Sequence, residues 1–178
     1  MRIIAGKAKR RSLRVPSQDT RPMTARAREG LFSSLGPIEG ARVLDLYAGS
    51  GSLGLEALSR GARSATFVDR SPDAVDALET NVRELSLGGT VLASSVGAFL
   101  RRSSQTFDLA FVDPPYAESL ASVIEVMSEL EPRLAPGATV VVRRRVGEDP
   151  PKPPSGLHLV SRRRYGDDEL FRYQKDTR

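Results

Sequence analysis

The sequence has no cysteine, a single histidine (His158) and few aromatic residues, which make up 6% of the chain. Without cysteine there can be no disulfide bond, thiolate zinc site or cysteine nucleophile. One histidine cannot form a histidine metal cluster, so we expect no metal ion, and we interpret His158 as a structural or surface residue. No apolar run reaches the roughly 20 residues of a membrane-spanning helix, and no apolar stretch follows the basic N-terminal residues as in a signal peptide. We therefore expect a soluble, cytoplasmic protein that does not bind membranes. Separately, we expect it to be a monomer.

Positive charge is concentrated at the start of the chain. Residues 1–35 contain nine Lys and Arg residues against two acids, a net charge of +7, whereas the remainder has 18 basic and 20 acidic residues, a net charge of −2. Such a segment is typical of proteins that bind a polyanion, although a solvated leader would have the same composition. The candidate RNA-binding residues are Arg2, Lys7, Lys9, Arg10, Arg11, Arg14, Arg21, Arg26 and Arg28.

The rest of the chain alternates short apolar runs with segments of helical period. We predict strands at 41–47, 64–69, 90–95, 108–113 and 138–143, and helices at 52–59, 72–85, 96–102 and 118–130. This alternation indicates a parallel sheet with helices on both faces, a Rossmann-like α/β fold. Two further strands near 157–165 and 168–174, joined at Gly166-Asp167, predict a hairpin that adds at least one antiparallel strand.

The first 35 residues predict an extension rather than a second core. RIIAGK and SLRVP resemble two short strands around Gly6, and Thr24 is a suitable N-cap for a helix that ends near Leu35. We therefore divide the chain into a basic extension, 1–35, and a main domain, 36–178. Removing the extension should weaken use of a nucleic acid while sparing the binding of a cofactor.

A glycine-rich loop follows the first strand of the main domain. Gly49, Gly51 and Gly54 form a G-x-G-x-x-G pattern between strand and helix, and Asp69 follows Gly49 by 20 residues, at the end of the next strand. Glycines let the backbone approach a nucleoside cofactor, and the acid at the end of the second strand accepts hydrogen bonds from ribose hydroxyls. The pattern also fits a dinucleotide. A carboxylate at Asp45 would favour the ammonium and sulfonium of S-adenosylmethionine over a pyrophosphate, unless it only binds loop amides.

The sequence Asp113-Pro114-Pro115-Tyr116 ends the fourth strand and decides between these cofactors. Two prolines fix the loop and remove two backbone donors, so the loop presents carbonyl oxygens beside the carboxylate, and the Tyr116 ring offers a flat surface. This combination suits an exocyclic amine on a stacked nucleobase. Acceptors outside the ring plane would favour a pyramidal nitrogen whose lone pair points at a methyl group. Asp113 can hold the amine and take the proton that the new bond makes acidic.

These motifs resemble those of S-adenosylmethionine-dependent methyltransferases that act on amino groups. The N-terminal stretches RIIAGKAKRRSLRVP and RPMTARAREGLFSSL extend the resemblance to the whole chain, which is similar to the RsmD-type bacterial 16S ribosomal RNA guanine-N2 methyltransferases. The resemblance implies a seven-strand sheet, S-adenosylmethionine as cofactor, and 16S RNA of the small ribosomal subunit or its assembly intermediate as substrate. It implies a guanine site at Asp113, Pro114, Pro115 and Tyr116, and closure of the segment 21–28 over the cofactor or the RNA. Many methyltransferases carry an acid after the third strand, where this chain has Ser95-Val96. The implied cofactor residues are Asp45, Ala48, Gly49, Ser50, Gly51, Gly54, Asp69, Arg70 and Ser95.

Other interpretations fit parts of the sequence. A DNA adenine-N6 methyltransferase could use the same amine pocket, but the chain leaves little room for a DNA-reading domain. A non-catalytic RNA-binding protein would not need amine acceptors, and a dehydrogenase would explain neither the tetrapeptide nor the basic segment. The triplets 143–145 and 162–164 can be RNA contacts or, by our preference, solvated edge charges. Tyr47 and Phe32 can line the cofactor pocket, although core packing is the simpler interpretation.

Overall fold

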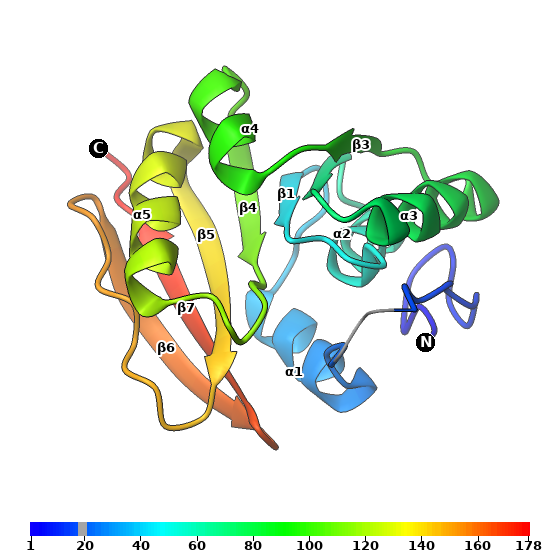
Figure 1. Ribbon diagram of the computed structural model, residues 1–178, viewed down its shortest axis with the longest axis horizontal. Helices are drawn as coiled ribbons and strands as arrows, with labels where there is room; N and C mark the ends of the chain where they lie inside the picture. Colours follow the sequence, from blue (N-terminus) through cyan, green and yellow to red (C-terminus); the bar gives the residue numbers. More distant parts are fainter. Residues whose placement is uncertain (18–20) are drawn as a thin grey trace.

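The computed structural model describes residues 1–17 and 21–178. A seven-stranded sheet in the order β3-β2-β1-β4-β5-β7-β6 forms its centre (Figure 1). Strand β7 is antiparallel to β5 and β6, and the remaining neighbours are parallel. The predicted sheet and its antiparallel C-terminal strand are therefore confirmed. The strands are β1 (Arg42–Leu46), β2 (Ser64–Asp69), β3 (Thr90–Ala93), β4 (Phe107–Val112), β5 (Leu134–Arg145), β6 (Leu157–Tyr165) and β7 (Asp168–Lys175).

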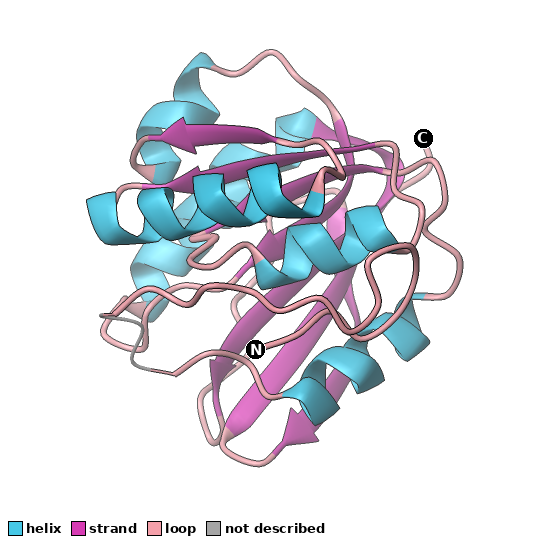
Figure 2. Ribbon diagram, turned by 90° about the vertical axis from the view of Figure 1, so that its right-hand side faces the viewer, coloured by secondary structure: helices cyan, strands magenta, loops and turns pink. Residues whose placement is uncertain are grey.

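Helices cover both faces of the sheet (Figures 1 and 2). Side chains of α1, α2 and α3 belong to one hydrophobic cluster, and those of α4 and α5 belong to the other. Successive residues of β1 and β4 point alternately into the two clusters, which explains why these central strands are apolar throughout. None of the helices in the described residues is long and apolar enough to cross a membrane. The helices are α1 (Ala25–Leu35), α2 (Ser52–Ser59), α3 (Pro72–Leu85), α4 (Val96–Arg102), α5 (Leu120–Leu130) and a 3-10 turn, η1 (Glu131–Arg133).

Two predicted features differ from the structure. Strand β5 begins earlier than predicted because it includes an irregularity at Pro136-Gly137. Leu134 pairs with Phe107 and Thr139 pairs with Leu109, so β5 has extra residues between these two pairs. The prediction of two short N-terminal strands is wrong, because the only pairing there in the described residues is an isolated bridge between Arg2 and Ser12. The predicted helix after Thr24 is confirmed, and the Thr24 side chain accepts a hydrogen bond from the backbone N of Ala27 at 3.1 Å.

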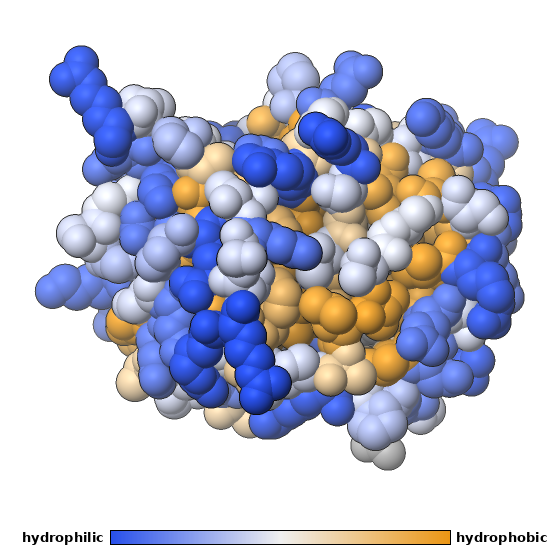
Figure 3. Space-filling model, turned by 90° about the horizontal axis from the view of Figure 1, so that it is seen from above, coloured by the Kyte–Doolittle hydropathy of each residue, from blue (hydrophilic) through white to orange (hydrophobic). Residues whose placement is uncertain are grey.

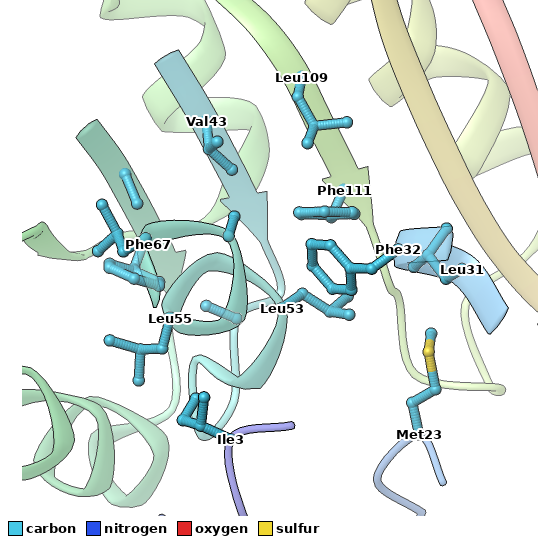
Figure 4. Close-up of a cluster of buried hydrophobic side chains, with 14 of the residues drawn as sticks. Ile3, Met23, Leu31, Phe32, Val43, Leu53, Leu55, Phe67, Leu109 and Phe111 are labelled. Carbon is cyan, nitrogen blue, oxygen red and sulfur yellow. The ribbon is translucent and has the colours of Figure 1, made fainter. Parts of the chain in front are cut away.

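The N-terminal segment packs into the main core. Ile3, Met23 and Phe32 belong to the same buried cluster as Phe111 of β4, and the Phe32 and Phe111 ring centroids lie 5.8 Å apart (Figure 4). These apolar contacts fix the described residues of the N-terminal segment against the main domain.

Polar groups of α2 and α3 complete this attachment. The buried Glu56 carboxylate accepts hydrogen bonds from the backbone N of Ile4 at 2.8 Å and of Ala5 at 3.0 Å. The Asn81 side chain donates to the carbonyls of both Arg14 and Ser50, at 2.8 and 2.9 Å. Asn81 therefore connects the N-terminal segment directly to the glycine loop.

Candidate active site

A cleft of about 560 Å³ lies at the carboxyl ends of the parallel strands. Residues from the loops after β1, β2, β3 and β4 line it, as expected for ligand sites in open α/β sheets. The N-terminal segment forms another wall, through Pro16 and residues 21–23. From this position we expect the N-terminal segment to contribute to cofactor binding as well as to RNA binding.

The loop after β1 is held in place by the acid at the end of β2. One Asp69 carboxylate oxygen accepts from the backbone N of Gly49 and the other from that of Ser71, both at 2.9 Å. Gly51 has φ +76°, and a Cβ there would lie 2.2 Å from Leu78 Cδ1, so only glycine fits this turn against α3. The predicted cofactor residues that line the cleft are Ala48, Gly49, Ser50, Asp69, Arg70 and Ser95.

Three predicted cofactor residues, Asp45, Gly51 and Gly54, are not among the residues that line the cleft. The Asp45 side chain is buried beneath the loop, where Oδ2 accepts a hydrogen bond from the backbone N of Gly54 at 2.8 Å. Burial raises the pKa of Asp45 well above its usual value, and the charges of Asp113 and Asp69 raise it further. Asp45 therefore supports the loop from below, which is the simpler of the two interpretations that its sequence position allowed.

The loop after β3 lacks the acidic residue that many methyltransferases have there, and its Ser95 caps a helix instead. The Ser95 hydroxyl accepts from the backbone N of Ala98 at 3.3 Å, so its main role is to begin α4. Ser94, Ser95 and Val96 all line the cleft. Any adenine contact on this side would therefore rely on serine, backbone and apolar groups rather than on a carboxylate.

The four residues Asp113-Pro114-Pro115-Tyr116, in the loop after β4, all line the same cleft. The carbonyl of Pro115 accepts a hydrogen bond from the backbone N of Glu118 at 2.9 Å and closes the turn. The carboxylate of Asp113 and the carbonyl of Pro114 are thus the acceptors that this loop can offer to a ligand. Pro115 serves the shape of the loop.

A buried arginine from β5 organises this loop, and the sequence interpretation missed it. Arg143 Nη1 donates to both carboxylate oxygens of Asp113, at 3.2 and 3.1 Å, and Nη2 donates to the hydroxyl of Tyr116 at 3.1 Å. Arg143 Nε donates to Asp168 at 2.9 Å, and the Tyr116 hydroxyl also donates to Asp168. One guanidinium therefore fixes both the carboxylate and the aromatic ring of the candidate amine pocket.

The charge states within this network follow from its contacts. Burial alone would lower the pKa of Arg143, but the charge of Asp113 and the bonds to Tyr116 and Asp168 outweigh burial and raise it, so the guanidinium stays charged. Burial and the bond to Asp168 raise the pKa of Tyr116, so its phenol stays protonated. The network holds a cation beside two carboxyl groups and a neutral ring.

The sequence did contain a signal for Arg143. The apolar runs of β4 and β5 both end at a charged residue, and Val112 pairs with Val142, which places Asp113 beside Arg143. Our preference for solvated edge charges is therefore wrong for Arg143 and Arg144, which are 6% and 5% exposed. Arg162 forms an ion pair with Glu169 of β7.

Two aromatic residues near the cleft have different roles. Tyr47 lines the cleft, and burial, followed by the charge of Glu118, raises its pKa to about 12. Phe32 instead packs in the core against Phe111.

The predicted RNA-binding residues fall into three groups. Arg21 lines the cleft, Arg26 lies close to it on α1, and Arg28 is buried at 2% exposure. Arg28 donates to the carbonyl of Arg2 at 3.0 Å, and its Nη1 lies 3.9 Å from Glu56, so its predicted RNA contact is wrong because the side chain is enclosed in the protein. The remaining side chains are exposed on the N-terminal segment: Arg2, Lys7, Lys9, Arg10, Arg11 and Arg14.

Comparison with known proteins identifies the family. The model of the family described as "Conserved hypothetical protein 95" matches residues 1–174. The chain belongs to this family. Among individual relatives, ribosomal RNA small subunit methyltransferase D of Escherichia coli (strain K12) is 36% identical over 180 residues, covering 99% of this chain and 91% of the relative. The family resemblance inferred from the motifs is thereby confirmed.

Solved structures agree with this assignment. The structure of yhhF from Escherichia coli has a TM-score of 0.90 and 35% identity, covering 100% of this chain and 99% of that one. SMU.776, solved in complex with SAH, has a TM-score of 0.67 and 14% identity, covering 84% of this chain and 48% of that one. This second likeness shows the shared fold.

Proposed function

We propose that the protein transfers a methyl group from S-adenosylmethionine to the exocyclic N2 amine of a guanine in 16S ribosomal RNA. The observation that carries the proposal is that the glycine loop, Asp69 and the Asp113–Tyr116 loop line one cleft. A nucleoside cofactor and an aromatic amine would therefore meet between them. The name of the Escherichia coli relative, a ribosomal RNA small subunit methyltransferase, supports ribosomal RNA as the substrate.

The cleft suits S-adenosylmethionine in size and in chemistry. Its volume of about 560 Å³ lies within the usual range of small-molecule sites. Asp69 would hold the ribose hydroxyls, Ala48, Gly49 and Ser50 would contact the cofactor along the loop, and Ser95 and Val96 would border the adenine. When bound, S-adenosylmethionine supplies a methyl group activated on a sulfonium.

The residues after β4 would hold the guanine. The Asp113 carboxylate and the Pro114 carbonyl accept the two N–H groups of the amine, and the Tyr116 ring stacks on the base. Arg143 holds the Asp113 carboxylate and the Tyr116 ring in a fixed orientation. The reacting nitrogen is then positioned before the reaction begins, which is the main contribution that the protein makes.

The reaction balances without a metal or a covalent enzyme intermediate. A bond forms between the guanine N2 and the methyl carbon, and the bond between that carbon and sulfur breaks, with its electron pair remaining on sulfur. The amine becomes acidic as the new bond forms. Its proton passes to Asp113 and from there to water.

The proposal also specifies the partner and the setting. The small ribosomal subunit or its assembly intermediate is the substrate, and the exposed basic residues of segment 1–35 add phosphate contacts. We propose that the protein acts as a monomer in the cytoplasm, where it meets this substrate. Residues 1–35 form the RNA-binding extension, and residues 36–178 form the methyltransferase domain.

Tritiated methyl transfer tests the proposal directly. The protein is incubated with labelled S-adenosylmethionine and undermethylated small ribosomal subunits, naked 16S RNA or DNA, and the product nucleosides are separated. We expect labelled N2-methylguanosine from the ribosomal substrates. Labelled N6-methyladenosine from DNA would replace this proposal with DNA adenine methylation, and no label despite measurable cofactor binding would indicate a non-catalytic RNA-binding protein.

A further inference from the structure

A second cavity, of about 850 Å³, opens beside the cleft, and we name it the side groove. Tyr116, Arg21, Pro22 and Arg143 line both cavities, so the Tyr116 loop separates them. The start of α1 and the turn between β6 and β7 form the other walls, and both lie at the lower end of the molecule in Figure 1. The residues that line only the side groove are Thr24, Arg26, Arg164, Tyr165, Gly166, Asp167 and Asp168.

Arginine dominates the charge of the side groove. Arg26 and Arg164 are exposed there, and the Arg145 guanidinium lies 5.0 Å from the centroid of the Tyr116 ring. The two aspartates at the groove both face arginines: Asp167 lies 3.8 Å from Arg21, and Asp168 accepts from Arg143. The groove therefore carries a net positive charge.

The groove wall is built by close packing between elements that are distant in sequence. The Tyr165 ring lies against Gly30 of α1, where an added Cβ would come within 2.4 Å of the Tyr165 hydroxyl oxygen. The Arg143 guanidinium donates to the carbonyl of Arg21 at 2.7 Å and so fixes the Arg21-Pro22 segment, which lines both cavities. The groove thus has a defined shape between α1 and the β6–β7 turn.

We propose that the side groove binds the sugar–phosphate backbone of the nucleotide next to the target guanine in a single-stranded stretch of RNA. The inference rests on the proposed function, because a base held at Tyr116 remains attached to its strand. That strand must leave the cleft at Tyr116, where the side groove begins. Guanidinium groups recognise phosphate oxygens with two hydrogen bonds, and an extruded base requires such backbone contacts to fix its position.

Removal of two arginines that line the groove, Arg26 and Arg164, together with Arg145 beside Tyr116, tests the proposal. The triple variant Arg26→Ala/Arg145→Ala/Arg164→Ala is compared with Arg63→Ala/Arg83→Ala/Arg102→Ala, which removes the same charge from exposed residues elsewhere. Arg63 precedes β2, and Arg83 and Arg102 lie near the C-terminal ends of α3 and α4, all toward the amino ends of the parallel strands. Figure 3 shows that end of the molecule, which is opposite to the side groove.

The probe is a fluorescein-labelled single-stranded oligoribonucleotide, and its binding to the full chain is followed by fluorescence anisotropy at several salt concentrations. We expect the groove variant to bind at least about tenfold more weakly than the control. The slope of log K against log salt should be smaller by about 0.7 than in the control, because one lost contact to a single-stranded phosphate contributes about 0.7. The affinity for S-adenosylmethionine, measured by calorimetry, should stay within about twofold.

Equal RNA affinity and equal salt slope in the two triple variants would overturn the proposal. An equal loss of RNA and cofactor affinity in the groove variant, with Tm unchanged, would also overturn it, because these arginines would then serve the cofactor cleft and not the RNA backbone in particular. The proposed function fails separately, if the wild-type protein transfers no methyl group to ribosomal RNA. Arginine-dependent binding in that case would still support a phosphate-binding groove.

Discussion

Asp113 is the residue on which the proposed chemistry depends most. We expect Asp113→Ala to lower turnover by about 100-fold or more, because the amine loses its charged acceptor, while the affinity for S-adenosylmethionine changes little. Asp113→Asn is the matched control, since it keeps one acceptor oxygen and should retain more activity. Methyl transfer with saturating RNA measures turnover, and an Asp113→Ala variant as active as the wild type would refute the assigned role.

Arg143 is a positioning residue, because it acts through Asp113 and Tyr116. Arg143→Met leaves two carboxyl groups without their buried cation, so we expect a loss of roughly 3 kcal/mol in the free energy of unfolding by urea. Arg143→Lys keeps the charge but not the geometry of the guanidinium. It should lower kcat with a smaller change in KM for S-adenosylmethionine, whereas unchanged kcat would show that the network serves stability alone.

Because the Asp45 carboxyl is buried, we expect the stability of the folded protein to depend on pH. Burial raises its pKa in the folded protein above the unfolded value, so between these two values the folded state binds more protons and stability falls as pH rises. Asp45→Asn keeps an acceptor for the Gly54 N–H and removes this titration. We expect the Asp45→Asn variant to have a higher Tm than the wild type at pH 7 and no such gain in Tm at pH 3. A gain of equal size at both pH values would contradict the buried-carboxyl explanation.

At the scale of elements, the attachment of the N-terminal segment to α2 depends on Gly6. Gly6 has φ +82°, and an added Cβ would lie 1.8 Å from the carbonyl oxygen of Ser59. Gly40 has a similar φ of +76° with nothing within 4 Å, so Gly40→Ala measures the backbone strain alone. We expect Gly6→Ala to lower the free energy of unfolding by about 1–3 kcal/mol more than Gly40→Ala does. If denaturant unfolding shows the same loss in free energy of unfolding for Gly6→Ala and Gly40→Ala, the N-terminal segment is not tightly packed at Gly6.

At the scale of the whole molecule, the N-terminal segment and the cofactor cleft form one unit. Removing residues 1–16 takes away Ile3 and Leu13 from the core and Pro16 from the cleft wall. We expect the truncated protein to have a lower Tm and a weaker affinity for S-adenosylmethionine as well as for RNA. Replacing the exposed Lys7, Lys9 and Arg10 by alanine is the control, which should weaken RNA binding only. A truncated protein with unchanged cofactor affinity would restore the simpler division that the charge distribution suggested.

The sequence by itself determined the order of the elements, the glycine loop with Asp69, and the position of the Asp113–Tyr116 loop after β4. These features depend on local propensities and on the rule that the carboxyl ends of parallel strands meet at one edge. It also carried the motifs of the family. All of them follow from patterns that can be read along the chain without knowing which side chains are buried.

Only the tertiary structure decided which charged residues are buried and which are available to a substrate. Arg28 and Arg143 look alike in sequence to the exposed arginines beside them, but one is enclosed near Glu56 and the other is bound to Asp113. Their partners lie 28 and 30 positions away, and the register of strands and the docking of α1 bring them together. Burial of a charge depends on such distant partners, because an unpaired charge would remain in water.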